Sequence, residues 1–150
     1  MITLKIAYRI KTATEEEICR HLINCSRYFI PALSEYVEIG QYSKKIFTKA
    51  ITFEAWVENT LSGMVAAYFN DIEKKSGYIT SVSIEPKSRG MGIASTLIQN
   101  CIEYATSNQF KEIQLEVNKK NEPAINLYQK HGFVVTEELG ASLFMRRNCL

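Results

Sequence analysis

The sequence has little proline or glycine and no long apolar run. Only 3 of its 150 residues are proline and 7 are glycine, and no stretch rich in proline, glycine or serine interrupts the chain. Flexible linkers are built from such stretches, so we expect one domain over residues 1–150. No apolar run approaches the roughly 20 residues of a membrane-spanning helix. Residues 1–10 also lack the regions of a signal peptide.

Charge of one sign is not in excess either. The chain has 18 Lys and Arg against 16 Asp and Glu, a net charge of +2, whereas a general nucleic-acid binder is usually strongly basic. Hydrophobic residues make up 46% and charged residues 23% of the chain, which excludes a disordered protein. These features predict a cytoplasmic, globular protein that binds neither nucleic acid nor membrane.

Metal-binding and disulfide patterns are also missing. The four cysteines contain no CxxC pair, and the two histidines, His21 and His131, lie far apart in the sequence. A zinc site needs ligands at short spacings, so we expect no metal. We expect Cys19, Cys25, Cys101 and Cys149 to be free thiols, although two disulfides are possible by count. A nucleophilic cysteine with a histidine partner stays open, with no local motif in its favour.

The apolar pattern predicts an α+β fold with the element order β-α-α-β-β-β-α-β-α-β-β. The expected strands are residues 3–9, 51–57, 64–69, 78–84, 111–117, 134–136 and 142–146. Short connections between the second, third and fourth of these strands favour an antiparallel meander. The later alternation of strand and helix adds a parallel pair at the middle of a mixed central sheet flanked by helices.

Four helices are expected. Thr14 and Glu17 form a capping box for the first, whose apolar stripe is predicted to reach Phe29 before Pro31 ends or kinks the helix. Residues 32–50 are ambiguous, with a short helix expected around 44–50. A strongly amphipathic helix is expected over 93–105. The last runs from the cap Asn121 to His131-Gly132, where glycine fits a left-handed helix end.

The loop between the fourth strand and the third helix has the features of an anion site. It reads Arg89, Gly90, Met91, Gly92, Ile93, Ala94 and Ser95. The first helical turn offers unpaired N–H groups, glycines let a phosphate approach the backbone, and an arginine adds charge. An ordinary strand-to-helix turn remains the alternative. The loop lacks the GxxxxGK[ST] pattern of a P-loop and the third glycine of a dinucleotide-binding loop.

Two motifs together resemble those of the GCN5-related N-acetyltransferase (GNAT) superfamily. Arg89-x-x-Gly92-x-Ala94 is similar to its pyrophosphate signature. Asn121-x-x-Ala124-x-x-Leu127-Tyr128-x-x-x-Gly132-Phe133 is similar to its second motif. The motifs cover residues 78–135, and the N-terminal third agrees in element order only. The resemblance implies a single N-acetyltransferase domain, an acyltransferase that uses acetyl-CoA as acetyl donor and needs no metal.

The resemblance also implies where acetyl-CoA binds. The strand before the loop, at Val82, Ser83 and Ile84, would pair with the pantetheine amides. N–H groups of Gly90 through Ser95 would hold the pyrophosphate, and Asn121 would lie near the pantetheine or its sulfur. A backbone N–H of Val82 or a neighbour is the expected oxyanion donor.

Catalytic roles follow for two residues. The resemblance places a tyrosine that protonates the CoA thiolate at Tyr128, although a core tyrosine is the alternative. Glu116 lies with Glu112 and Gln114 on the polar face of its strand, which suggests a solvated cleft, and relatives place a basic glutamate there. An exposed structural face is the alternative. Glu85, Ser83 and bulk water are weaker candidates for the base.

The acceptor is expected to be a primary amine of a small molecule, such as an amino sugar or an amino acid. A protein N-terminal or lysine amine and a non-catalytic acyl-CoA-binding module are the alternatives. Residues 22–50 and 70–77 are expected to shape the acceptor pocket. The first range holds Tyr28, Phe29, Tyr36, Tyr42 and Phe47. A homodimer is plausible.

Overall fold

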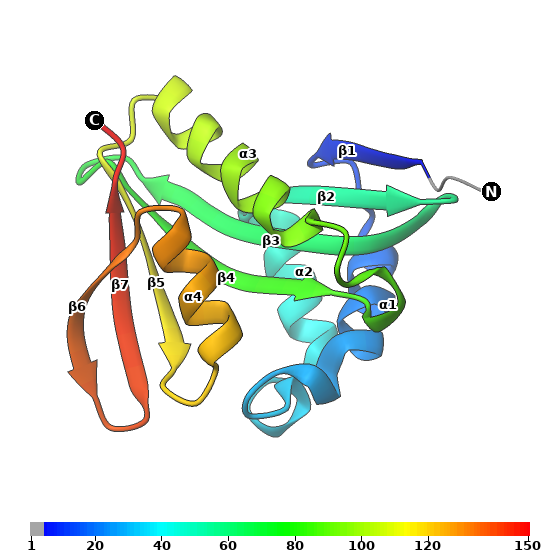
Figure 1. The fold of residues 1–150 in the computed structure, drawn as a ribbon. Helices are drawn as coiled ribbons and strands as arrows, with labels where there is room; N and C mark the ends of the chain where they lie inside the picture. The colour runs from blue at the N-terminus through cyan, green and yellow to red at the C-terminus, as the bar shows by residue number, and fades with distance from the viewer. Residues whose placement is uncertain (1–4) are drawn as a thin grey trace.

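Seven strands form one mixed sheet in the computed structural model, which describes residues 5–150 (Figure 1). Their order is β1-β2-β3-β4-β5-β7-β6, and every neighbouring pair is antiparallel except β4 and β5. The strands are β1 (Ile6–Ile10), β2 (Ile51–Val57), β3 (Thr60–Asp71), β4 (Ser76–Ile84), β5 (Glu112–Asn118), β6 (Val134–Leu139) and β7 (Ser142–Asn148). The predicted α+β class and element order are confirmed.

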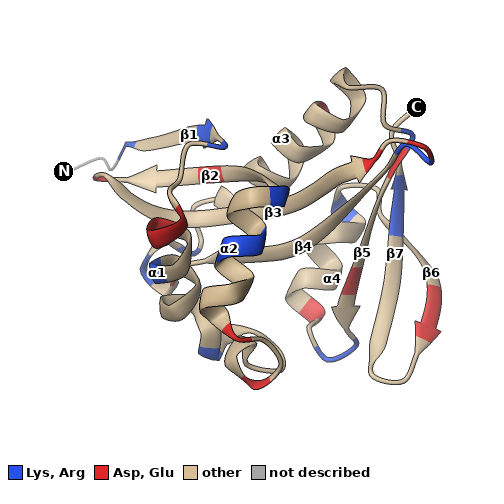
Figure 2. Ribbon diagram, turned by 180° about the vertical axis from the view of Figure 1, so that it is seen from behind, with Lys and Arg blue, Asp and Glu red and all other residues tan. Residues whose placement is uncertain are grey.

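Helices cover the two faces unequally. On one face, α1 (Glu15–Cys25) and α2 (Ile39–Lys49) bury an apolar cluster that includes Leu22 and Ile46. On the other, α3 (Ile93–Ser107) and α4 (Glu122–Lys130) bury a second cluster that includes Leu97 and Phe133. Figure 2 shows α1 and α2 in front of β2–β4, with no helix over β5, β7 and β6. We call this uncovered part the open face; it carries Gln114, Glu116, Phe144 and Arg146.

Most local signals in the sequence act as expected. The Thr14 hydroxyl accepts from Glu17 N while the Glu17 carboxylate accepts from Thr14 N, so the capping box is formed. The Asn121 side chain caps α4, and Gly132 has a φ of +89° just past its end. Strands β3, β6 and β7 run further than predicted. Residues 3 and 4 of the first predicted strand lie outside the described part of the chain.

The segment between the first two helices differs from the prediction. Helix α1 ends at Cys25, well before Pro31, and Phe29 therefore does not extend its stripe. Two short 3₁₀ turns, η1 (Ser26–Tyr28) and η2 (Leu33–Glu35), follow. Helix α2 begins at Ile39 because the Glu38 carboxylate accepts from Gln41 N as its cap. A glutamate is an uncommon cap, so the pattern hid this helix start.

Candidate active site

The two parallel strands pair over only part of their length. Pairing of β4 with β5 runs from Ser76↔Glu112 to Ile79↔Leu115 and then stops. Beyond it a cavity of about 630 Å³ opens, lined by Thr80–Ile84 on β4 and by Leu115–Asn118 on β5. A register shift in the β3–β4 pairing, beside Thr80, falls at the same point. Bulges of this kind redirect the backbone beside active sites. The β4 edge facing the cavity is thus available to an extended ligand.

The glycine loop forms one end of this cavity. Gly90 and Gly92 have φ values of +81° and +74°, and a Cβ at either position would meet nothing within 4 Å. The helix α3 begins directly after Gly92. Open space, left-handed backbone and the positive end of a helix dipole together fit a phosphate group. The residues present therefore fit the pyrophosphate of a coenzyme.

Two residues of the predicted phosphate loop are not part of the cavity lining. Arg89, Gly90, Gly92, Ile93 and Ala94 line the cavity, together with Val82, Ser83, Ile84 and Asn121. Met91 and Ser95 are not among the described residues that line it. The Ser95 hydroxyl instead lies 2.8 Å from His131 Nε2, at the end of α4. This contact ties the two motif helices together.

Tyr128 lies in the cavity wall on α4. It is 6% exposed, and its ring packs 5.9 Å from that of Phe133. Burial raises the pKa of its hydroxyl, so the group stays protonated at neutral pH. A proton donor needs this state.

Glu116 lies on the open face of β5 and lines the same cavity. It is directly opposite Phe144 on β7, and the Ser142 hydroxyl donates to its carboxylate. Burial, followed by the nearby charge of Glu116, raises the pKa of Tyr36 and of Tyr78. The charge of this carboxylate therefore acts on two phenol groups. Among the described residues that line the cavity, Glu116 has the only carboxylate and Arg89 the only positively charged side chain.

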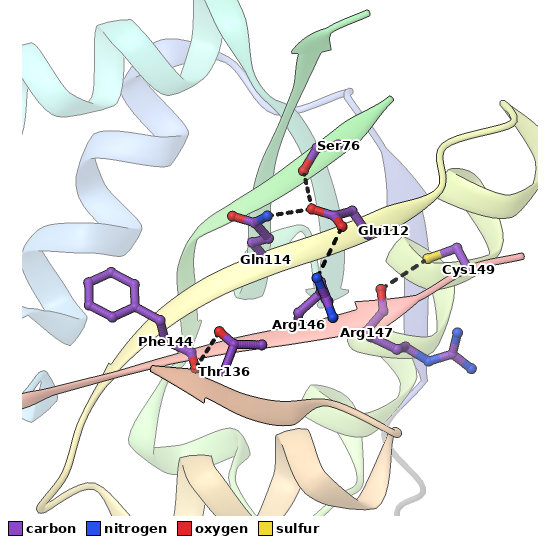
Figure 3. Close-up of polar contacts among 8 residues, drawn as sticks. All are labelled: Ser76, Glu112, Gln114, Thr136, Phe144, Arg146, Arg147 and Cys149. Atoms are coloured by element: carbon purple, nitrogen blue, oxygen red, sulfur yellow. Dashed lines mark hydrogen bonds and ion pairs between the residues drawn. The ribbon is translucent and has the colours of Figure 1, made fainter. Parts of the chain in front are cut away.

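The other acid on this face of β5 is already occupied (Figure 3). The Glu112 carboxylate accepts from the Ser76 hydroxyl at 3.0 Å and from the Gln114 amide, and it lies 3.9 Å from Arg146 Nη1. No ion pair within 4.0 Å is found for Glu116 in residues 5–150. Of the two carboxylates, Glu116 is the one available to a cationic ligand.

The weaker candidates for the base lie away from the acceptor side. Glu85 is 5% exposed, and its carboxylate lies 3.9 Å from Lys87 Nζ. The Ser83 hydroxyl lies 2.9 Å from Nε2 of the buried His21. Glu85 and Ser83 therefore each already have a partner within the protein.

Part of the region predicted to shape the acceptor pocket lines the cavity. Cys25, Tyr28, Phe29, Ile30 and Tyr36 do so, whereas no described residue of 70–77 does. Tyr42 is used structurally, since its hydroxyl donates to Thr80 O at 2.8 Å. The effect of Glu116 on Tyr36 and Tyr78 was missed. Tyr36 was expected only within the range 22–50, and nothing in the sequence pattern connected it with Glu116.

Comparisons with known proteins agree with this architecture. The profile of the Acetyltransferase (GNAT) family matches residues 15–133. An N-alpha-acetyltransferase of Sulfurisphaera tokodaii is 27% identical over 84% of this chain and 80% of its own length. A streptothricin acetyltransferase of Escherichia coli is 32% identical over 55% of this chain and 47% of its own. The crystal structure of PaiA N-acetyltransferase from Thermoplasma acidophilum with coenzyme A has a TM-score of 0.76 at 14% identity, over 95% of this chain and 99% of that one.

Proposed function

The chain belongs to the GNAT acetyltransferase family and is an acetyl-CoA-dependent N-acetyltransferase, and from this premise we propose that it acetylates a primary amine presented at Glu116. The cavity carries this proposal, because it joins a phosphate-binding loop at one end to a lone carboxylate at the other. An anionic cofactor and a cationic amine thus have separate, complementary ends. We also propose that residues 1–150 form one catalytic domain, and that the protein is cytoplasmic, in keeping with its four free cysteines.

Acetyl-CoA would be held by groups of the chain that already fit it. N–H groups of Gly90 through Ser95 would bind the pyrophosphate, and the β4 edge at Val82–Ile84 would pair with the pantetheine amides. Asn121 would lie near the sulfur end. Its Oδ1 accepts from Ala124 N at 3.3 Å, which leaves its amide N–H groups to contact a ligand. The cofactor supplies an acetyl group activated as a thioester.

Glu116 and Tyr128 would handle the protons. A free alkylammonium has a pKa near ~10 and must lose a proton before it attacks. Glu116 would take up that proton directly or through one water, because its carboxylate faces the acceptor end of the cavity. Tyr128 would protonate the departing sulfur, and its buried hydroxyl is kept in the protonated form. Bulk water remains the alternative to Glu116.

We propose the N-terminal amine of a polypeptide as acceptor. Glu116 lies on the open face, and Tyr36 is 57% exposed beside it, so a long chain can lie across β5 and β7 with its amine at the carboxylate. The aromatic rings of Tyr36, Tyr78 and Phe144 suit a cationic group. The N-alpha-acetyltransferase relative covers most of both chains and supports this acceptor.

A small-molecule amine, such as an amino sugar or amino acid, is the second candidate. The same carboxylate and aromatic rings would bind it, and the streptothricin acetyltransferase relative supports this class. The sequence favoured this acceptor. We place it second because the acceptor side is an open sheet face rather than an enclosed pocket.

A two-panel acceptor assay separates the classes. Release of free CoA thiol would be measured with acetyl-CoA and either short peptides of varied first residue or small amines, including amino sugars and amino acids. Peptides with a blocked N-terminus and an internal lysine control for lysine acetylation. We expect turnover with free N-terminal peptides. Turnover with small amines alone would overturn the polypeptide proposal, and CoA binding without turnover on either panel would overturn the enzymatic one.

A further inference from the structure

Two arginines lie over one tyrosine ring beside the cofactor loop. The guanidinium carbon of Arg27, in η1, is 4.9 Å from the ring centre of Tyr28, and that of Arg89 is 4.7 Å from the same centre. The Arg27 Nη2 also donates to the Tyr28 hydroxyl at 2.7 Å. The ring of Tyr28 therefore contacts two positive groups, one from η1 and one from the glycine loop.

Neither guanidinium has a carboxylate to neutralise it. Within residues 5–150 the ion pairs below 4.0 Å involve neither Arg27 nor Arg89. For a guanidinium without a counter-charge, contact with an aromatic ring supplies only part of the stabilisation that an anion would give. Tyr28 and Arg89 line the cavity with Gly90 and Gly92. The pair thus borders the space where an anion fits.

We propose that Arg27 and Arg89, held by Tyr28, form a bracket for a phosphate group of coenzyme A. Arg89 belongs to the family signature, whereas Arg27 comes from a segment outside both motifs. Guanidinium groups suit phosphate because their planar N–H forks donate two hydrogen bonds and keep their charge. The inference rests on the proposed cofactor site. It adds a binding residue from η1, next to the cavity-lining Tyr28.

The bracket also gives η1 a role in cofactor binding. A phosphate held by Arg27 and Arg89 would fix Tyr28 and the turn that carries it. That turn leads into the segment with Phe29, Ile30 and Tyr36, which lines the acceptor end. Cofactor binding would therefore order the acceptor wall.

Calorimetric titration of the full chain tests the bracket. Coenzyme A, dephospho-coenzyme A and pantetheine would be titrated into the parent, Arg27→Gln and Arg20→Gln. Arg20 is exposed on α1, has no cation–π contact with Tyr28 within residues 5–150, and undergoes the same loss of charge. We expect Arg27→Gln to weaken coenzyme A binding about five- to tenfold, as the loss of one charge-assisted hydrogen bond would do, and to leave pantetheine binding unchanged.

The three ligands separate the possible phosphates. A loss seen with coenzyme A but not with dephospho-coenzyme A assigns Arg27 to the 3′-phosphate, and an equal loss with both assigns it to the pyrophosphate. Equal affinities of Arg27→Gln and Arg20→Gln would overturn the bracket. Failure of the parent to bind coenzyme A would instead overturn the proposed cofactor site.

Discussion

The imidazole Nε2 of His21, on α1, lies 2.9 Å from the hydroxyl of Ser83, on β4. Its Nδ1 lies 3.2 Å from Leu61 O, on β3. Because a carbonyl only accepts, Nδ1 carries the proton and Nε2 accepts from Ser83. A buried, neutral histidine therefore joins a covering helix to the strand that lines the cofactor side of the cavity.

This geometry predicts loss of stability in mild acid. Burial lowers the pKa of His21, against the opposing effects of Glu85 and of the hydrogen bonds to Leu61 and Ser83. The unfolded chain takes up a proton near pH ~6.5 and the folded chain only at lower pH, so the free energy of unfolding falls as pH drops below ~6.5. The slope for this one group is at most about 1.4 kcal/mol per pH unit. Urea unfolding at pH 7.5 and 5.5 measures it.

The matched variants are His21→Gln and His131→Gln. His21→Gln should have a lower free energy of unfolding than the parent at pH 7.5. That free energy should fall less than the parent's when the pH is lowered to 5.5. The second, at the less buried histidine, should keep most of the parent's pH dependence. An unchanged pH dependence in His21→Gln would show that another group causes the acid loss.

Replacing Tyr128 by phenylalanine should affect chemistry rather than cofactor binding. The ring and its contact with Phe133 remain, while the proton donor is lost. Positioned proton donors contribute at least about 100-fold, so we expect turnover to fall by about that factor while the affinity for acetyl-CoA changes less than about twofold. Steady-state kinetics and titration with CoA measure the two effects. Tyr104→Phe, in the aromatic cluster with Phe53 and Phe69, is the control. Unchanged turnover in Tyr128→Phe would remove this residue from the acid role.

The Glu116→Gln variant should lose activity most at low pH. There the acceptor amine is almost wholly protonated and needs a base, whereas near the pKa of a peptide N-terminal amine, about 8, it deprotonates without help. We expect a fall of about 100-fold in kcat/KM at pH 7 that shrinks toward pH 9. Glu112→Gln is the control, because Glu112 is engaged by Ser76 and Gln114. A pH–rate profile parallel to that of the parent would assign deprotonation to water.

The parts of the fold that depend on local pattern could be predicted from sequence. Alternation placed Ile113, Leu115 and Val117 in the core and Glu116 on the opposite face, as observed. The cap at Asn121 and the left-handed Gly132 also followed from short-range chemistry. These features need only a few neighbouring residues, and both motifs lie in this part of the chain.

Contacts between distant segments could not be predicted in this way. The pairing of His21 with Ser83 spans 62 positions, and the approach of Tyr36 to Glu116 depends on how the segment after α1 crosses the sheet. That segment has two short 3₁₀ turns and a helix capped by Glu38, none of which has a strong sequence signal. The cofactor side was therefore visible in the sequence, whereas most of the acceptor side required the structure.

The variant Gly92→Ala, compared with Gly140→Ala, should separate the effect of backbone strain on stability from the effect of an added methyl group on phosphate binding. Gly92 has a φ of +74°, and Gly140, in the β6–β7 turn, has a φ of +59°; a Cβ at either position would meet nothing within 4 Å. Both alanine variants should therefore lose about 1–2 kcal/mol of stability, the cost of a left-handed residue with a side chain. Only Gly92→Ala adds a methyl group to the cofactor loop, so only it should weaken CoA binding, by about tenfold. Thermal unfolding and CoA titration of both variants measure the two effects. Equal CoA affinities in the two variants would mean that the cofactor phosphates do not approach Gly92.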